Sequence, residues 1–112
     1  MKIAKFSKVS YEQFEKDAAK KAPHHYKTNE GEIKRVYENI STPVRATKYS
    51  AGYDIKSPFK IILLPKESIT IPTGLRCEMF EGYVMMIYPR SSFGIKKGGV
   101  LLNTTGVIDR DY

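Results

Sequence analysis

The sequence contains no tryptophan and only one cysteine, Cys77, among its 112 residues. With a single thiol the chain forms no internal disulfide, which excludes the disulfide-built folds of small secreted proteins and favours a reduced, cytoplasmic setting. The sequence also lacks an apolar run close to the roughly 20 residues that a membrane helix needs. No apolar segment follows the first lysines, so we expect neither a membrane span nor a signal peptide.

Charge of one sign is not concentrated anywhere in the chain. The formal net charge is +7, from 19 Lys and Arg against 12 Asp and Glu. Residues 1–35 hold nine basic against five acidic side chains, and residues 36–112 hold ten against seven. Because no block of five or six basic residues occurs, we expect no specific nucleic-acid binding. The positive excess also attracts a nucleoside triphosphate over long range, so charge alone does not identify the partner.

A helix is predicted for residues 10–22. Ser10 and Gln13 have the spacing of a capping box, in which each side chain satisfies a free backbone N–H. Pro23 stops the helix. Three apolar residues recur at i, i+4 and i+8 on one helical face, namely Phe14, Ala18 and Ala22. This face is expected to dock on the rest of the chain.

Weaker signals surround this helix. Residues 2–9 favour a short strand, residues 23–32 are polar and typical of a linker, and residues 35–40 fit another short strand or helical turn. We therefore expect an amino-terminal strand, helix and linker over residues 1–35, followed by one domain over residues 36–112.

From residue 43 onward the pattern is that of short β-strands. Phe59–Leu64 is an apolar run closed by a proline, and Ser68–Ile71 alternates before a Pro-Thr-Gly turn. Tyr83–Tyr88 is apolar on both faces, as expected for a central strand covered on both sides. A half-buried strand is predicted where Leu75, Cys77 and Met79 alternate with Arg76 and Glu78. Strands of this length punctuated by Gly and Pro predict an all-β sandwich or barrel.

Four polar motifs stand out in this β region. Ala51–Ile55 reads AGYDI, Pro89–Gly94 reads PRSSFG, Val100–Gly106 reads VLLNTTG, and Asp109–Tyr112 reads DRDY. The third of these is predicted to be a strand running into a turn, where Asn103 can offer its amide edge. The second motif suits an anion, because an arginine, two hydroxyls and a glycine can offer side-chain and backbone donors. The last places two carboxylates at i and i+2, on one face of an extended strand. Taken singly, each is more often an ordinary polar loop or a solvated edge.

Together and in this order, the motifs resemble those of the trimeric dUTP pyrophosphatase (dUTPase) family. AGYDI is similar to its first motif, PRSSFGIK to its second and NTTGVIDRDY to its third, over about residues 43–112. The resemblance implies an all-β, jelly-roll-like barrel that assembles as a homotrimer, here with an amino-terminal helix. Family members continue with further strands and a glycine-rich arm, so the chain is expected to be truncated and its barrel incomplete at the carboxyl terminus.

The resemblance also implies a role for each matched residue. Asp54 is expected to reach a Mg²⁺ ion through water, while the triphosphate supplies most of the ion's ligands. Asp109 is the expected general base. Asn103 pairs with the uracil edge, Gly106 forms the turn beside it, and Tyr112 lies under the deoxyribose and rejects UTP. The backbone of Val107 and Ile108 lines the sugar, and the phosphate-binding residues are Arg90, Ser91, Ser92 and Gly94.

The implied reaction is the Mg²⁺-dependent hydrolysis of dUTP to dUMP and pyrophosphate, which keeps uracil out of DNA. Two alternatives stay open at this point. One is a related nucleotide enzyme of the dCTP deaminase type, which has a similar Arg-Ser-Ser segment. The other is an inactive fragment that binds a nucleotide or another protein.

Overall fold

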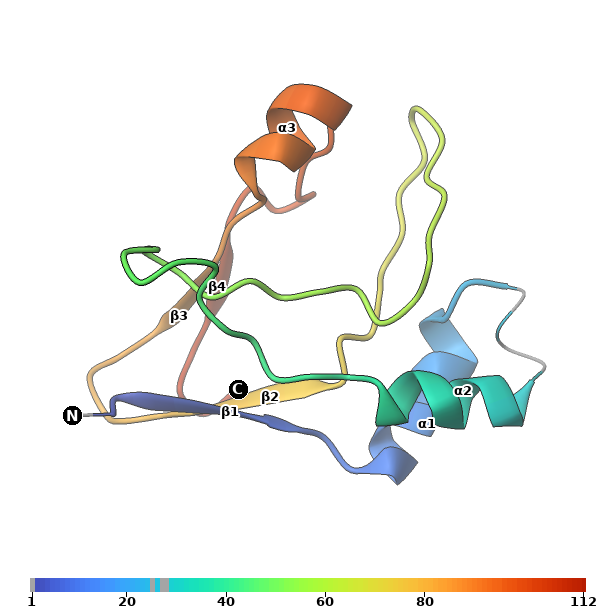
Figure 1. The fold of residues 1–112 in the computed structure, drawn as a ribbon, viewed down its shortest axis with the longest axis horizontal. Coiled ribbons are helices and arrows are strands. Elements are labelled where there is room, and N and C mark those ends of the chain that lie inside the picture. Colours follow the sequence, from blue (N-terminus) through green and yellow to red (C-terminus); the bar gives the residue numbers. More distant parts are fainter. Residues whose placement is uncertain (1, 25, 27–28) are drawn as a thin grey trace. The chain divides into compact units, whose positions relative to one another are not determined.

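The computed structural model describes residues 2–24, 26 and 29–112 as three helices and four short strands (Figure 1). The strands form two two-stranded sheets, β1 with β2 and β3 with β4. The predicted fold is therefore confirmed only in part, because paired strands are present but the described residues form no closed barrel. In chain order the elements are β1 (Ala4–Lys8), α1 (Tyr11–Lys21), α2 (Glu30–Glu38), β2 (Leu75–Met79), β3 (Met85–Ile87), α3 (Ser91–Lys97) and β4 (Gly106–Ile108).

The chain divides into two compact units. One consists of Met1–Lys5 with Cys77–Tyr112, and the other of Phe6–Arg76. We call them the motif unit and the helical unit. No helix in the described part of the chain is long and apolar enough to cross a membrane.

The predicted amino-terminal helix is confirmed as α1. Ser10 caps it by accepting a hydrogen bond of 3.1 Å from the backbone N–H of Gln13. The other half of the predicted capping box, a bond from the Ser10 N–H to the Gln13 side chain, is not found among the described residues. The Gln13 amide nitrogen donates to Asp17, 3.1 Å away. The predicted face is buried over its whole length, at Phe14, Ala18 and Ala22.

Helix α2 begins inside the predicted linker and includes residues 35–38, so of the two alternatives predicted for residues 35–40 the helical one is met in part and the strand is wrong. The Asn29 side chain caps α2 by accepting a hydrogen bond of 3.2 Å from the N–H of Glu32. Apolar residues then recur at helical spacing, at Ile33, Val36 and Tyr37 within α2 and at Ile40 just after it. This signal was present in the sequence but obscured by the polar residues before it. The linker prediction also covers residues 25, 27 and 28, which lie outside the described residues.

The core of the helical unit joins the two helices to Phe59. Phe14 is fully buried, and its ring stacks on Phe59 with centroids 5.8 Å apart and planes 9° apart. Tyr26 meets the same Phe59 ring edge-on at 5.0 Å. The buried cluster consists of Phe14, Ala18, Ala22, Ile33 and Phe59.

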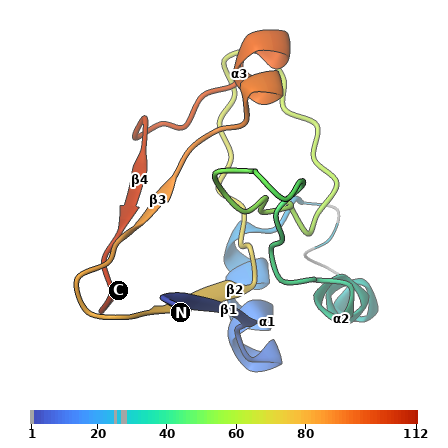
Figure 2. The ribbon, with the colours of Figure 1, turned by 60° about the vertical axis from the view of Figure 1, so that its left-hand side comes forward.

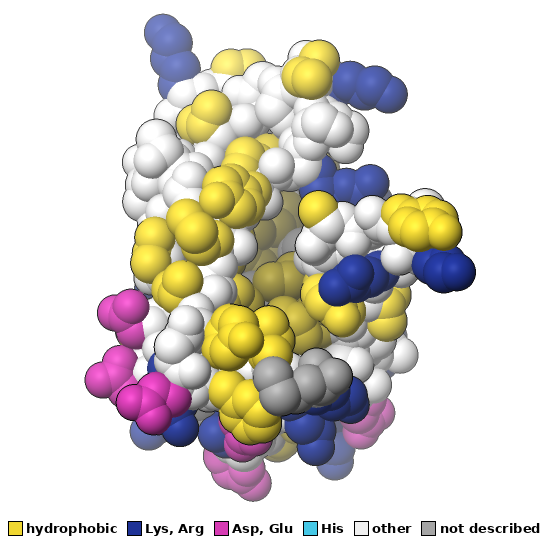
Figure 3. Space-filling view, turned by 90° about the vertical axis from the view of Figure 1, so that its left-hand side faces the viewer, with side chains coloured by type: hydrophobic (Ala, Val, Ile, Leu, Met, Phe, Trp, Pro, Cys, Tyr) yellow, Lys and Arg dark blue, Asp and Glu magenta, His cyan; other side chains and the backbone are white. Residues whose placement is uncertain are grey.

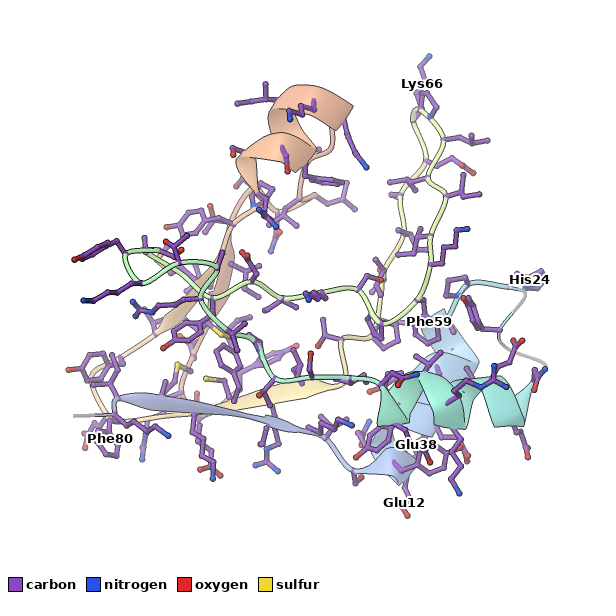
Figure 4. All side chains as sticks on the ribbon, in the orientation of Figure 1. Glu12, His24, Glu38, Phe59, Lys66 and Phe80 are labelled. Carbon is purple, nitrogen blue, oxygen red and sulfur yellow. The ribbon has the colours of Figure 1, made fainter. Side chains whose placement is uncertain are left out.

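Two of the predicted strands are wrong in this structure. Phe59–Leu64 and Ser68–Ile71 instead form the arms of a long loop, with Lys66 at the tip (Figure 4). The tip is a turn in which the N–H of Glu67 donates 3.0 Å to the carbonyl of Leu64. The alternation of apolar and polar residues correctly predicted extended backbone, but neither arm has a ladder partner among the described residues. As a result Ile62 is 82% exposed, although the base of the loop is buried at Phe59.

Gly74 lies against the helical core and provides a test of its packing. Its φ is +71°, and a Cβ there would come within 2.5 Å of Ile40 Cδ1 and 3.1 Å of Phe14 Cδ1. We expect Gly74→Ala to lower the free energy of unfolding by about 1–3 kcal/mol from overpacking, beyond the roughly 1–2 kcal/mol of left-handed strain. Gly82→Ala is the matched control, because its φ is +87° and a Cβ there meets nothing within 4 Å. Equal losses in urea unfolding of the two variants would contradict this packing.

The motif unit contains the β3–β4 pair, which is antiparallel (Figure 2). The predicted strand over Tyr83–Tyr88 is shorter than expected and is not covered on both sides. Only Met85–Ile87 is in the ladder, and Tyr83, Val84, Met86 and Tyr88 are exposed. These exposed side chains show that the strand is not covered on both faces, and hydrophobic side chains are visible at the surface in Figure 3.

The alternation predicted for Leu75–Met79 is confirmed in β2. Leu75, Cys77 and Met79 are at least partly buried, while Arg76 and Glu78 are exposed. Cys77 is only partly buried, so it is less enclosed than a core thiol. Its burial raises the pKa of the thiol above its ordinary value.

Candidate functional site

All of the predicted site residues except Asp54 lie in the motif unit. Three of them, Gly106, Val107 and Ile108, form β4 itself, in a ladder where Met85 pairs with Ile108 and Ile87 pairs with Gly106. The others fall on three segments next to this ladder. The segment around Arg90 follows β3, the segment around Asn103 precedes β4, and the segment from Asp109 follows β4.

The segment predicted as a phosphate-binding turn is the start of a helix. Arg90 is the N-cap residue of α3 in an extended conformation, and its carbonyl accepts hydrogen bonds from Phe93 (3.0 Å) and Gly94 (3.1 Å). Ser91 and Ser92 form the first turn and are exposed. The sequence SSFGIKK forms the helix, which ends at Gly98, a left-handed C-cap at φ +65°.

The other residues of this segment are also solvent-exposed. Lys96 and Lys97 lie in the last turn of α3. Gly94 is not enclosed by the protein, because a Cβ added to it would only reach ordinary contact with the carbonyl of Gly99, at 3.8 Å. Its hydrogen atoms therefore leave room on the helix surface for a ligand.

Asn103 lies in a tight turn and not at the end of a strand. The N–H of Thr104 donates 3.0 Å to the carbonyl of Leu101, and that of Thr105 donates 2.7 Å to the carbonyl of Asn103. Thr104 takes a left-handed φ of +61°. The predicted strand before this turn is absent, since no strand is found over residues 100–105. The Asn103 side chain is exposed.

Gly106 is buried, and its neighbour across the sheet explains why it is a glycine. A Cβ at Gly106 would come within 3.2 Å of Ile87 Cβ, its partner in the ladder. Val107 and Ile108 pair with Met86 and Met85, so the ladder fixes their backbone.

Asp109 and Tyr112 lie in a turn directly after β4. The N–H of Tyr112 donates 3.1 Å to the carbonyl of Asp109. The prediction that Asp109 and Asp111 share one face of a strand is therefore wrong, because the extended chain ends at Ile108. Asp109 is exposed, and the Tyr112 ring is 96% exposed.

Arg110 is the residue of this turn that sequence reasoning overlooked. Its Nε–H donates a hydrogen bond of 2.8 Å to the carbonyl of Met79. The only signal in the sequence was a cation between two carboxylates, which is also typical of a solvated turn.

The β3–β4 ladder places two of these segments at opposite ends (Figure 2). Arg90 and α3 belong to the end where Ile87 pairs with Gly106, and Asp109 belongs to the end where Met85 pairs with Ile108. Asn103 lies at the same end as Arg90. One chain therefore carries the Arg90 segment at one end of the ladder, and the exposed Asp109 carboxylate and Tyr112 ring in the turn at the other end.

Asp54 belongs to the helical unit. Its N–H donates 3.0 Å to the carbonyl of Val44, which closes a loop over residues 44–54. Inside the loop Arg45 lies over the Tyr53 ring, 4.9 Å from its centroid, and donates 3.2 Å to the carbonyl of Ser50. A hollow of about 220 Å³ beside it is lined by Ser41, Thr42, Val44, Ala46, Asp54 and Lys56.

The donor set limits how a metal could be held. The described residues contain no group of three or more His, Cys, Asp or Glu side chains placed to hold an ion. Asp54 is partly buried and offers one carboxylate. Such a set fits an ion whose other ligands come from water and a bound phosphate, as Mg²⁺ prefers.

Comparison with known proteins gives a consistent result. The family model described as dUTPase matches residues 38–112. The deoxyuridine 5'-triphosphate nucleotidohydrolase of Lactococcus lactis is 47% identical over 83 residues, which cover 72% of this chain and 55% of that protein. The enzymes of the same name from Fusobacterium nucleatum and Nautilia profundicola are 42% and 41% identical, covering 67% and 71% of this chain and 53% and 56% of their own. The chain thus spans about half the length of the curated relatives it matches.

Proposed function

Because the chain belongs to the dUTPase family, we propose that it serves the hydrolysis of dUTP to dUMP and pyrophosphate. The observation that carries the proposal is the family match over residues 38–112, which includes every predicted site residue. The names of the matched relatives favour this reaction over the deaminase alternative.

The phosphate chain is proposed to bind at the start of α3. Arg90 supplies a fixed positive charge, and Ser91 and Ser92 supply hydroxyl donors on an exposed surface. Because Gly94 has no side chain, a ligand can approach the backbone closely there. Phosphoryl transfer depends mainly on positioning and charge neutralisation, and these groups provide both.

Base and sugar selection are assigned to the segments on either side of β4. Asn103 is proposed to pair with the uracil edge and Gly106 to shape the turn beside it. The backbone of Val107 and Ile108 then lines the sugar, and the exposed Tyr112 ring lies under the deoxyribose, where a 2′-hydroxyl has no room. A wrong base leaves a buried polar group unpaired, which costs about 1–3 kcal/mol.

Asp109 is proposed as the general base. Its exposed carboxylate can accept a proton from the water molecule that attacks the α-phosphorus, while the pyrophosphate leaves with the P–O bonding electrons. A divalent cation, proposed to be Mg²⁺, neutralises phosphate charge when bound, and Asp54 would hold it through water.

The proposed assembly is the homotrimer of the family. In one chain Arg90 and Asp109 lie at opposite ends of the ladder, and in the proposed trimer segments from different chains complete one pocket. The exposed apolar side chains around β3 are suited to burial against a neighbouring subunit. The jelly-roll-like barrel and the cytoplasmic location expected from the single cysteine belong to the same proposal.

Ligand choice tests the proposal. The test uses the protein encoded by the whole natural reading frame that contains these 112 residues, here called the complete protein. We expect dUTP to be preferred over UTP and dCTP, because Asn103 and Tyr112 reject the wrong base and the 2′-hydroxyl. Calorimetric titration with a non-hydrolysable analogue of each nucleotide measures this preference. Equal affinity for the dUTP and UTP analogues would refute the role of Tyr112, and an absence of dUTP turnover would refute the proposed function.

A further inference from the structure

Arg110 ties the turn that carries Asp109 and Tyr112 to the end of β2. Its Nε–H donates 2.8 Å to the carbonyl of Met79, which precedes it by 31 residues, and the contact is partly buried. A charged donor makes a stronger hydrogen bond than a neutral one, and partial burial reduces the competition from water.

The acceptor of this bond is itself held in place. Met79 is the last residue of β2 and one of the buried residues of the chain. The N–H of the next residue, Phe80, donates 2.9 Å to the carbonyl of Ile3, which continues the pairing at the end of the strand. Arg110 therefore attaches an exposed turn to an ordered part of the same unit.

Asp109 lies between two fixed neighbours. On one side Ile108 pairs with Met85 in the β3–β4 ladder. On the other side Arg110 is bonded to Met79. The hydrogen bond from the Tyr112 N–H to the Asp109 carbonyl closes the turn beyond them. The carboxylate of Asp109 stays exposed while the backbone on both sides of it is held.

We propose that Arg110 is a positioning residue for the proposed hydrolysis. Through its bond to Met79 it holds the turn so that the base, Asp109, and the sugar gate, Tyr112, keep a fixed orientation. The inference rests on the proposed function, since it assigns Arg110 a role toward those two residues. Lysine is only a partial substitute, because its Nζ lies one bond further from the backbone than the Nε that makes this contact.

The test compares Arg110→Met, which keeps the apolar stem and removes the donor, with Arg110→Lys. The matched control is Arg76→Met, which removes an exposed arginine from β2. The kcat and KM for dUTP and UTP are measured in the complete protein. We expect R110M to lower kcat for dUTP by up to about 100-fold, to change KM less, and to narrow the discrimination against UTP. R110K should be intermediate, and R76M should behave like the wild type.

A second measurement does not depend on activity. Amide hydrogen exchange of Tyr112, whose N–H is bonded to Asp109, should be faster in R110M than in the wild type and unchanged in R76M. Unchanged kcat, selectivity and exchange in R110M would overturn the inference. So would an R110M protein that is unfolded by circular dichroism, because Arg110 would then serve overall stability. A wild-type protein without dUTP turnover overturns the proposed function instead, and exchange then still decides whether Arg110 holds the turn.

Discussion

Asp109→Asn is expected to reduce dUTP turnover by about 100- to 10,000-fold while leaving nucleotide binding nearly unchanged. The substitution removes a proton acceptor and changes little volume. Because Asp109 is exposed and lies in a turn after β4, the loss of its charge should not disturb the ladder that precedes it.

The measurement is steady-state pyrophosphate release by the complete protein, with calorimetry of a non-hydrolysable dUTP analogue alongside. Asp111→Asn is the matched control, since it removes the same charge two residues later from the same turn. If D109N keeps wild-type turnover, another group activates the water. If D109N and D111N lose turnover equally, the effect comes from the charge of the turn and not from a general base.

Phe14→Ala is expected to lower the free energy of unfolding by about 3–5 kcal/mol. Phe14 is fully buried, stacks on Phe59 and lies 5.6 Å from the ring of Tyr37, so its removal leaves a cavity at the centre of the helical core. A domain of ordinary stability has only about 5–15 kcal/mol to lose.

Urea unfolding followed by circular dichroism measures this change. Phe80→Ala provides the control, because it deletes the same side chain at a position that is 54% exposed and should cost far less. Similar losses in the two variants would show that the α1–α2 core does not carry the stability of the helical unit.

The two amino-terminal helices show what local signals can predict. For α1 the cap at Ser10, the apolar face and the proline that follows all agreed, and the helix was confirmed. For α2 the same kinds of signal are present from Asn29 onward, but the polar residues of this stretch also predict a linker. The division into residues 1–35 and 36–112 stays a prediction.

The strands were harder to predict because a strand depends on a partner far away in the sequence. The alternation in β2 predicted its burial correctly, since β1 pairs with it. The equally apolar Phe59–Leu64 has no such partner in the described chain and stays a loop. Periodicity describes which face a strand would bury and does not say whether anything covers it.

The candidate site was predicted through the order of its motifs and not through its geometry. The assignments of Arg90, Asn103 and Asp109 remain predictions, although the local structure around each differs from what was expected. The residues after Arg90 form a helix, although a turn was predicted there. The residues after Asp109 form a turn, although a strand was predicted there. Arg110 was overlooked because its partner, Met79, is distant in the sequence.

The pairing of β1 with β2 also constrains the order in which the chain can fold. Hydrogen bonds at the two ends of this pair join Val9 to Gly74 and Ile3 to Phe80, so the intervening chain must close a long loop. The entropy lost on closing a loop grows with its length. Helices α1 and α2 are neighbours in the sequence and, with Phe59, compact that loop through contacts of shorter range. We therefore expect the helix pair to form early in the folding of its unit and the β1–β2 sheet to form late.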